Sequence, residues 1–207
     1  MRKKNKIILS LILTAFLSLF FLMNFVSASD TSSDVEYGLL YNWYTVDDSR
    51  GLCPEGWHVP SYTEFQTFHE YLEPVSYFYM DYKIKEVGTD HWVPNEGATD
   101  ETGFSALGGG MRTYTGIFIE LKERADFISS TSFSEVYPEQ NRSYDCFEIY
   151  LSSYSSGDIW VGANRKKAGS SVRCIRDSSD EWAEGEVVVD YDGNVYNTVV
   201  IGTLIWT

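Results

Sequence analysis

The sequence is poor in cations and in histidine, and it carries only three cysteines. Lysine and arginine together number 16 against 30 aspartates and glutamates, so the formal net charge is −14. Nucleic acids and anionic membrane surfaces are bound mainly through Lys and Arg, so this balance speaks against both as partners. The composition, 43% apolar and 16% aromatic, is typical of a globular domain rather than of a disordered chain.

The sequence also lacks the short motifs of common catalytic sites. There is no HExxH, P-loop or GxGxxG motif, and the run from Gly103 to Leu107 lacks the last glycine of a GxSxG nucleophile elbow. His58, His69 and His91 show no metal-ligand spacing, and no CxxC pair or Cys/His cluster indicates a zinc site. We therefore predict a protein without catalytic residues.

Residues 1–28 have the pattern of an export signal. A basic start precedes the uncharged run 7–25, and Val26-Ser27-Ala28 supplies the small residues that signal cleavage needs. The alternative is a retained membrane anchor, because an uncharged run of this length nearly spans a bilayer, but polar residues dilute it. We predict cleavage after Ala28 and a secreted or cell-surface location, with no membrane contact beyond this segment.

Export places the cysteines in a compartment where disulfides persist. Cys53, Cys146 and Cys174 allow one disulfide and leave one free thiol. Counting alone does not decide which pair is bonded.

The clearest helix signal begins at Ser61. The run Ser-Tyr-Thr-Glu is a capping box, in which Ser61 caps the helix and Glu64 bonds back to the cap. It predicts a helix over 62–72. Three apolar residues follow at helical spacing, and we expect them to face the core: Phe65, Phe68 and Leu72.

We expect the rest of the body to form short strands and turns. The aromatic run Tyr37–Val46 predicts a buried strand or extended segment, and 75–85 has no assignable pattern. β-Prone runs between turn signals lie at 113–121, 127–131, 146–154, 159–163 and 171–176. One helix, many short strands and a loop-rich half predict an α+β fold.

The last segment, 178–207, differs from the body in its residue pattern. An acidic stretch over 178–186 forms a linker, and apolar and polar residues then alternate around Asp192-Gly193. An Asp-Gly pair suits a tight type I′ turn, so the sequence predicts a β-hairpin here.

Five stretches, in order along the chain, resemble one protein family. They are YGLLYNWYTV (37–46), GLCPEGWHVPSYTEF (51–65), ATDETGFSALGGGMR (98–112), SSTSFSE (129–135) and IYLSSYSSGDIWVGANRKKAGSSVRCIRD (149–177). Together they resemble the Fibrobacter succinogenes major paralogous domain, which we place at residues 35–177. The family occurs in exported bacterial proteins, often as repeated modules. It is similar in turn to the C-type lectin-like fold of sugar-binding lectins and formylglycine-generating enzymes.

The resemblance implies a C-type lectin-like fold, with one main capped helix, short antiparallel strands and a long loop-rich half. In lectins of this fold the cysteine before the first helix bonds to the cysteine of the last strand. This implies a Cys53–Cys174 disulfide and leaves Cys146 as the odd one. The formylglycine-generating reaction depends on a thiol pair that binds copper, and a single Cys146 beside a bridged pair does not reproduce it.

The order of the segments departs from the family pattern. Family domains open with a segment like DxDGNxYxTVxIGxQxWM, whereas here DYDGNVYNTVVIGTLIWT occupies residues 190–207. The tail is either the start of a truncated second copy or the displaced first segment of a permuted domain. We favour docking of a permuted segment, because its apolar alternation is strong. The tail is then expected to pair with the strand at 171–176 and to cover 37–46.

Candidate ligand-binding residues gather in one loop. We expect exposed rings at Trp92 and in the group Tyr77, Tyr79 and Tyr82, where they would suit stacking on a sugar or contact with a protein. The loop from Asn95 and the run 190–194 offer oxygen ligands of the kind that calcium prefers. Turn geometry and solvation also account for them, and neither has calcium-loop spacing. The predicted ligand-binding set is Trp92, Asn95, Glu96, Asp100 and Glu101.

These features predict an exported, non-enzymatic, lectin-like binding module that recognises a glycan or another extracellular protein. The alternative is a structural surface module without a specific ligand. An enzyme related to formylglycine-generating enzymes is the least favoured reading.

Overall fold

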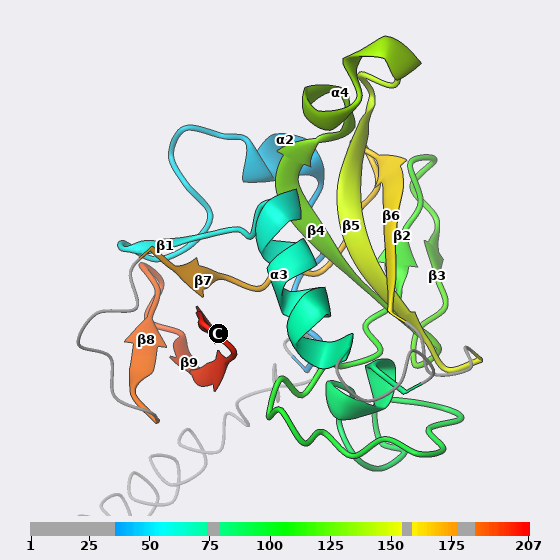
Figure 1. Cartoon of the computed structure of the whole chain (residues 1–207), viewed down its shortest axis with the longest axis vertical. Helices are drawn as coiled ribbons and strands as arrows, with labels where there is room; N and C mark the ends of the chain where they lie inside the picture. The colour runs from blue at the N-terminus through cyan, green and yellow to red at the C-terminus, as the bar shows by residue number, and fades with distance from the viewer. Residues whose placement is uncertain (1–35, 74–78, 155–158, 178–184) are drawn as a thin grey trace, which may run out of the picture. The chain divides into compact units, whose positions relative to one another are not determined.

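The computed structural model describes residues 36–73, 79–154, 159–177 and 185–207 (Figure 1). Tyr37–Thr207 form one compact unit, and the predicted signal segment 1–28 lies outside the described residues. The unit consists mostly of small antiparallel strands with few helices, which confirms the α+β class. Among the residues described, no helix has the length and apolar character that crossing a membrane requires.

The capping box at Ser61 starts helix α3 (Tyr62–Leu72), as predicted. The Ser61 hydroxyl accepts a hydrogen bond from the Glu64 N–H at 3.3 Å, and the Glu64 carboxylate accepts one from the Ser61 N–H at 2.8 Å. These two bonds satisfy backbone groups that a helix start otherwise leaves unpaired. The apolar stripe of the helix is buried, as predicted: Phe65, Phe68 and Leu72.

A three-stranded antiparallel sheet, in the order β4–β5–β6, packs against this helix (Figure 1). Its strands are β4 (Arg124–Ser132), β5 (Asp145–Ser152) and β6 (Trp160–Arg165). Phe127, Ile149 and Leu151 of the sheet share one core with the helix. The remaining short elements of this part are η3 (Asp81–Lys83), β2 (Met111–Arg112), β3 (Phe118–Ile119), α4 (Phe133–Val136) and η4 (Pro138–Gln140).

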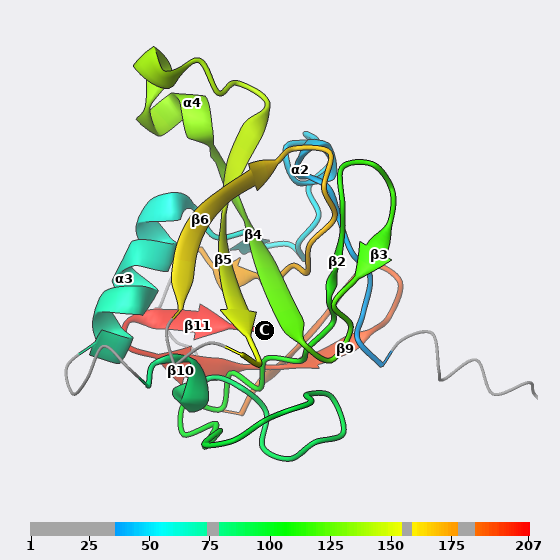
Figure 2. The same ribbon diagram turned by 90° about the vertical axis from the view of Figure 1, so that its right-hand side faces the viewer.

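A second sheet joins segments that lie far apart in the sequence, in the order β1–β7–β11–β10. Its strands are β1 (Trp57–His58), β7 (Ile175–Arg176), β11 (Leu204–Trp206) and β10 (Val199–Ile201). Trp206 of β11 pairs with Ile175 of β7, so the tail docks on the strand that we expected it to join. Figure 2 shows the β10–β11 hairpin next to one end of helix α3.

The side chain of Trp206 accounts for much of this docking. It is fully buried. Its ring lies against three phenylalanines, with centroid distances of 4.8 Å to Phe68, 5.4 Å to Phe104 and 6.0 Å to Phe65. A side chain of this kind buries about 150–250 Å². The tail therefore supplies part of the core instead of projecting from it.

The other half of the tail forms a separate two-stranded hairpin, as predicted, but with a different turn. Its strands are β8 (Val187–Val189) and β9 (Val195–Asn197). A type I′ turn needs positive φ at both central residues, yet Gly193 has φ 86° and Asp192 is not positive. The Gly193 N–H donates to the Asp190 carbonyl at 3.1 Å, and the Asp190 N–H donates to the Asn194 carbonyl at 3.0 Å. This is a tight turn closed by a one-residue bulge.

The prediction of a buried strand or extended segment over Tyr37–Val46 is wrong for its last four residues, although Tyr41 forms an antiparallel bridge with Ser170. Trp43–Val46 form a short helical turn, α2, because the Asn42 side chain caps it by accepting a hydrogen bond from the Thr45 N–H at 3.1 Å. Within this turn Trp43 is the buried side chain, and its indole N–H donates to a carbonyl of β4 at 3.2 Å. The local cap thus overrides the strand preference of the aromatic residues.

Candidate binding cleft

The aromatic residue of the predicted ligand loop is folded inward. Trp92, which we expected to be exposed, is fully buried; its indole N–H donates to a backbone carbonyl at 2.8 Å, and the Lys85 ammonium lies 4.9 Å from its ring centroid. The expectation is wrong because the indole finds an internal acceptor and the ring fills the core. Tyr79 is exposed, Tyr82 is half-buried, and Tyr77 lies outside the described residues.

The polar residues of the same loop mostly hold the loop together. Asp100 accepts hydrogen bonds from the N–H and the hydroxyl of Ser105 at 2.8 Å and 2.5 Å. The Asn95 amide donates to a backbone carbonyl at 2.7 Å, and Glu101 forms an ion pair with a lysine at 3.1 Å. Glu96 is exposed. The structure therefore separates these side chains from the buried Trp92, and their role in ligand binding stays a prediction.

His58 lies between two carboxylates. Its Nδ1 is 2.6 Å from Asp177 Oδ1, and its Nε2 is 3.0 Å from Glu64 Oε1. The hydrogen bond to Glu64 raises the pKa of His58, although burial opposes this. Burial also opposes ionisation of Glu64, but hydrogen bonds from His58 and Ser61 outweigh it and lower the pKa of Glu64 to about 2. The Ser61 hydroxyl donates to Glu64 at 2.7 Å, so this group of hydrogen bonds joins the start of α3 to the end of β7.

The other candidate sites for chemistry are a metal centre and the free thiol of Cys146. Within the described residues, no three His, Cys, Asp or Glu side chains gather so as to hold a metal ion. The Asp190 carboxylate, one of the candidate calcium ligands, accepts hydrogen bonds from the Asn194 amide and the Tyr196 hydroxyl, each at 2.8 Å. Burial, followed by the charge of Glu148, raises the pKa of the Cys146 thiol to about 12, so it stays protonated at neutral pH.

An open cleft of about 690 Å³ lies between the loop at 50–55 and the tail. We call it the tyrosine cleft, after Tyr41, Tyr191 and Tyr196, which all line it. The other lining residues come from the loop at 50–55, from the segment before β7, from the β8–β9 hairpin and from the end of β11: Arg50, Gly51, Leu52, Cys53, Pro54, Glu55, Val172, Cys174, Val189, Asp190, Asp192 and Thr207. Its volume falls in the range of about 300–1,000 Å³ that is usual for ligand sites.

The three tyrosines differ in exposure and in the charges around them. Tyr191 is fully exposed at the hairpin tip, whereas Tyr196 is tied down by its hydrogen bond to Asp190. Burial and this bond raise the pKa of Tyr196 to about 12. Burial, then the charges of Asp190 and Asp192, also raises the pKa of Tyr41. The phenols of Tyr41 and Tyr196 thus stay neutral at physiological pH beside carboxylates that line the same cleft.

The Cys53–Cys174 disulfide lines the same cleft and fixes its shape. The two Cα atoms lie 5.9 Å apart, so the pairing is the one that the family resemblance implied. Thr207 ties the tail to the disulfide by two hydrogen bonds. Its N–H donates to the Cys174 carbonyl at 3.0 Å, and its hydroxyl accepts from the Cys174 N–H at 3.1 Å. The disulfide and these hydrogen bonds together hold the loop at 50–55, the segment before β7 and the tail around the cleft.

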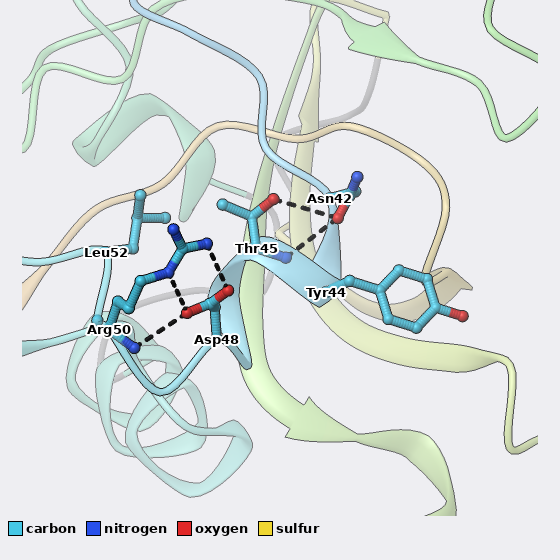
Figure 3. A pocket seen from close by; sticks show the side chains of 7 residues that line it. Asn42, Tyr44, Thr45, Asp48, Arg50 and Leu52 are labelled. Atoms are coloured by element: carbon cyan, nitrogen blue, oxygen red, sulfur yellow. Dashed lines mark hydrogen bonds and ion pairs between the residues drawn. The ribbon is translucent and has the colours of Figure 1, made fainter.

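A smaller hollow of about 430 Å³ adjoins this cleft and shares Arg50, Gly51 and Leu52 with it. Figure 3 shows Arg50 next to Asp48 and joined to it by hydrogen bonds, with Tyr44 directed away from this pair. The Arg50 Nε and Nη2 atoms donate to the two Asp48 carboxylate oxygens, each at 2.8 Å. This pairing raises the pKa of Arg50 and lowers that of Asp48.

Sequence reasoning missed the tyrosine cleft, because its residues come from separate segments. Tyr41 lies before α2, Glu55 precedes β1, and Tyr191 is at the tip of the β8–β9 hairpin. No local spacing connects them. The usable signal was the tail itself, since docking of the tail was expected and brings Tyr191 and Tyr196 to the body.

The chain belongs to the family of the Fibrobacter succinogenes major domain (Fib_succ_major), whose pattern it matches over residues 23–176. This confirms the family that the five sequence stretches indicated. Searches of the curated proteins and of the solved structures each gave no match.

Proposed function

We propose that the protein is an exported, non-enzymatic binding module that recognises a glycan in the tyrosine cleft. One observation carries the proposal: three tyrosines line one open cleft whose remaining lining is rich in hydrogen-bonding groups. A pyranose ring offers an apolar face and a rim of hydroxyls. A tyrosine ring matches the face and keeps a polar edge in water.

The polar lining suits the hydroxyl rim. The carboxylates of Glu55 and Asp192 accept hydrogen bonds, and the Arg50 guanidinium donates them. Tyr191 can stack without losing any packing in the free protein, because its side chain is fully exposed. The disulfide and the Thr207 bonds hold the other side of the cleft rigid, which limits the entropy lost on binding.

A C-type lectin-like arrangement is part of this proposal. It is supported by the capped helix α3 and by a disulfide that joins the segment before β1 to the segment before β7. The same disulfide supports export, together with the signal pattern of residues 1–28, because such bonds persist outside the cytosol. The buried, protonated Cys146 supports a role without thiol chemistry.

Binding assays with the purified protein test the proposal. A glycan array identifies candidate oligosaccharides, and calorimetric titration then compares the wild type with Tyr191→Ala. We expect a loss of affinity of about fivefold, because one stacked ring contributes on the order of 1 kcal/mol. The matched control is Tyr114→Ala, since Tyr114 is also exposed but does not line the cleft.

Three results would contradict glycan binding at this site. The first is an array without any bound glycan, and the second is equal affinity in the wild type and Tyr191→Ala. The third is retention of an extracellular protein through Tyr191 with no sugar competing, which would favour protein recognition instead.

A further inference from the structure

We infer that the tyrosine cleft selects oligosaccharides that carry free amino groups, as chains of unsubstituted hexosamine do. The inference rests on the proposed glycan binding and adds the charge class of the ligand. It comes from the balance of charged side chains that line the cleft, from the rings beside them, and from the state of the single cation among them.

Three carboxylates line the cleft against one cation: Glu55, Asp190 and Asp192 against Arg50. Asp190 is held by its bonds to Asn194 and Tyr196, which leaves its charge in place but its geometry fixed. Glu55 and Asp192 are exposed, and no hydrogen bond or ion pair engages either carboxylate within the described ranges. These two carboxylates are therefore free to meet ammonium groups of a ligand.

The Arg50 cation does not offset this charge. Both carboxylate oxygens of Asp48 accept hydrogen bonds from the Arg50 guanidinium at 2.8 Å. This is the bidentate geometry that makes arginine–carboxylate pairs strong (Figure 3). Arg50 and Asp48 together are close to neutral. An acidic sugar would have to displace Asp48 before it gained a cation.

The rings reinforce the preference for a cation. Asp190 and Asp192 lie close enough to Tyr41 to act on the ionisation of its phenol, so their potential extends across the cleft. An ammonium group within about 6 Å of a tyrosine ring is also attracted by the ring face. A hexosamine can therefore stack its apolar face on one ring while its ammonium meets a carboxylate or a second ring. A uronic or sialic acid meets repulsion at the same positions.

The test compares three sets of oligosaccharides of equal length by calorimetric titration of the whole protein. They are unsubstituted glucosamine oligomers, the same oligomers fully N-acetylated, and galacturonic acid oligomers. We expect the amino oligomers to bind about fivefold more tightly than the N-acetylated ones, which is the upper end of what one exposed ion pair contributes. The galacturonic acid oligomers should not bind measurably. The preference should shrink as salt is raised, because salt screens exposed charges.

Matched variants locate the effect. The double variant Glu55→Gln/Asp192→Asn should lose the preference for amines and keep its affinity for N-acetylated oligomers. Glu139→Gln, which removes an exposed carboxylate elsewhere, should keep the preference. Tyr191→Ala should weaken binding of both oligomers.

The outcomes separate the two proposals. If N-acetylated oligomers bind as tightly as amino oligomers, and Tyr191→Ala weakens both, the charge inference is wrong and glycan binding stands. If amino oligomers bind but Tyr191→Ala has no effect, the attraction comes from the net charge of −14 alone and the charge inference at this cleft is overturned. If no oligosaccharide of any class binds, both proposals fall.

Discussion

The two hairpins of the tail have similar apolar alternation but differ in how far they are buried. In β10–β11, Ile201, Ile205 and Trp206 are at most 5% exposed, and Val200 faces outward at 46%. In β8–β9 the buried side chain is Val188, at 9%, while Val187 and Val189 are 48% and 53% exposed. Within the part of the chain that the structure describes, β11 pairs with β7, whereas β8 and β9 pair with each other alone. Alternation therefore predicts a strand, and a further partner strand increases the share of its apolar residues that is buried.

The same comparison assigns different roles to the two hairpins. The β10–β11 hairpin completes the core against α3, and the β8–β9 hairpin contributes Val189, Tyr191 and Tyr196 to the tyrosine cleft. One hairpin is expected to govern stability and the other to govern binding. Substitutions in each should therefore produce effects of very different size.

The largest effect is expected from Trp206→Ala. Removing a fully buried tryptophan should lower the free energy of unfolding by about 4 kcal/mol, because the cavity stays between three phenylalanine rings. Urea unfolding measures this change. Trp206→Phe is the control, since it keeps a ring and removes an indole N–H that has no acceptor among the described residues; it should cost much less. A Trp206→Ala protein as stable as the wild type would mean that the tail does not dock.

The next largest effect is expected from loss of the disulfide in Cys53→Ser/Cys174→Ser. The bond closes a loop across a sequence separation of 121 residues, and its removal should cost about 3 kcal/mol by releasing the unfolded chain. The urea m value should rise, since a freer unfolded chain exposes more surface. Trp206→Ala acts on the folded state and should leave m unchanged. Cys146→Ala should still shift its midpoint on reduction, which shows that Cys146 is not in the bond.

A smaller effect is expected from His58, at the outer edge of the sheet that receives the tail. Its folded-state pKa is raised above 6.5, so its ion pairs contribute stability fully below that pH and lose it as the pH rises through the raised pKa. The half-exposed pairs should contribute at most about 1 kcal/mol. The stability difference between the wild type and His58→Gln should therefore vanish at high pH. An NMR titration giving His58 a pKa at or below 6.5 would contradict the geometry.

The smallest effect is expected from Val195→Thr, on the exposed hairpin. Threonine keeps the branched shape and the strand preference, and Val195 is 64% exposed, so unfolding should change by less than about 0.5 kcal/mol. The matched change on the other hairpin is Ile201→Thr, which places a hydroxyl in the core and should cost several times more. Equal costs for the two variants would mean that the hairpins do not differ as described.

Structure that depends on neighbouring residues was predictable from the sequence, and structure that depends on contacts between distant residues was not. The capping box at Ser61 located α3 correctly, because both partners of the cap lie within four residues. The aromatic run at 37–46 misled, because a single Asn42 cap outweighed its strand preference. In the region 113–121 a strand forms only at Phe118–Ile119, as part of a tight hairpin with β2.

The burial of Trp92 and the assembly of the cleft depend on contacts that no local pattern encodes. Trp92 is buried because a carbonyl of a later segment accepts its N–H. The cleft forms because the tail returns to a loop well over a hundred residues earlier in the chain. The Cys53–Cys174 bond was accessible only through the family resemblance, since the three cysteines alone left the pairing open.

The order of strands in the second sheet has a consequence for the time course of folding. Trp57, Ile175 and Trp206 lie in adjacent strands, so the sheet cannot close until residues 204–206 have left the ribosome. Until then Phe68 and Phe104 lack their contacts with the ring of Trp206. Contacts this distant in sequence slow folding, and we expect it to take milliseconds to seconds. A nascent chain therefore leaves this part of its core open to solvent for as long as residues 204–206 are still to be made.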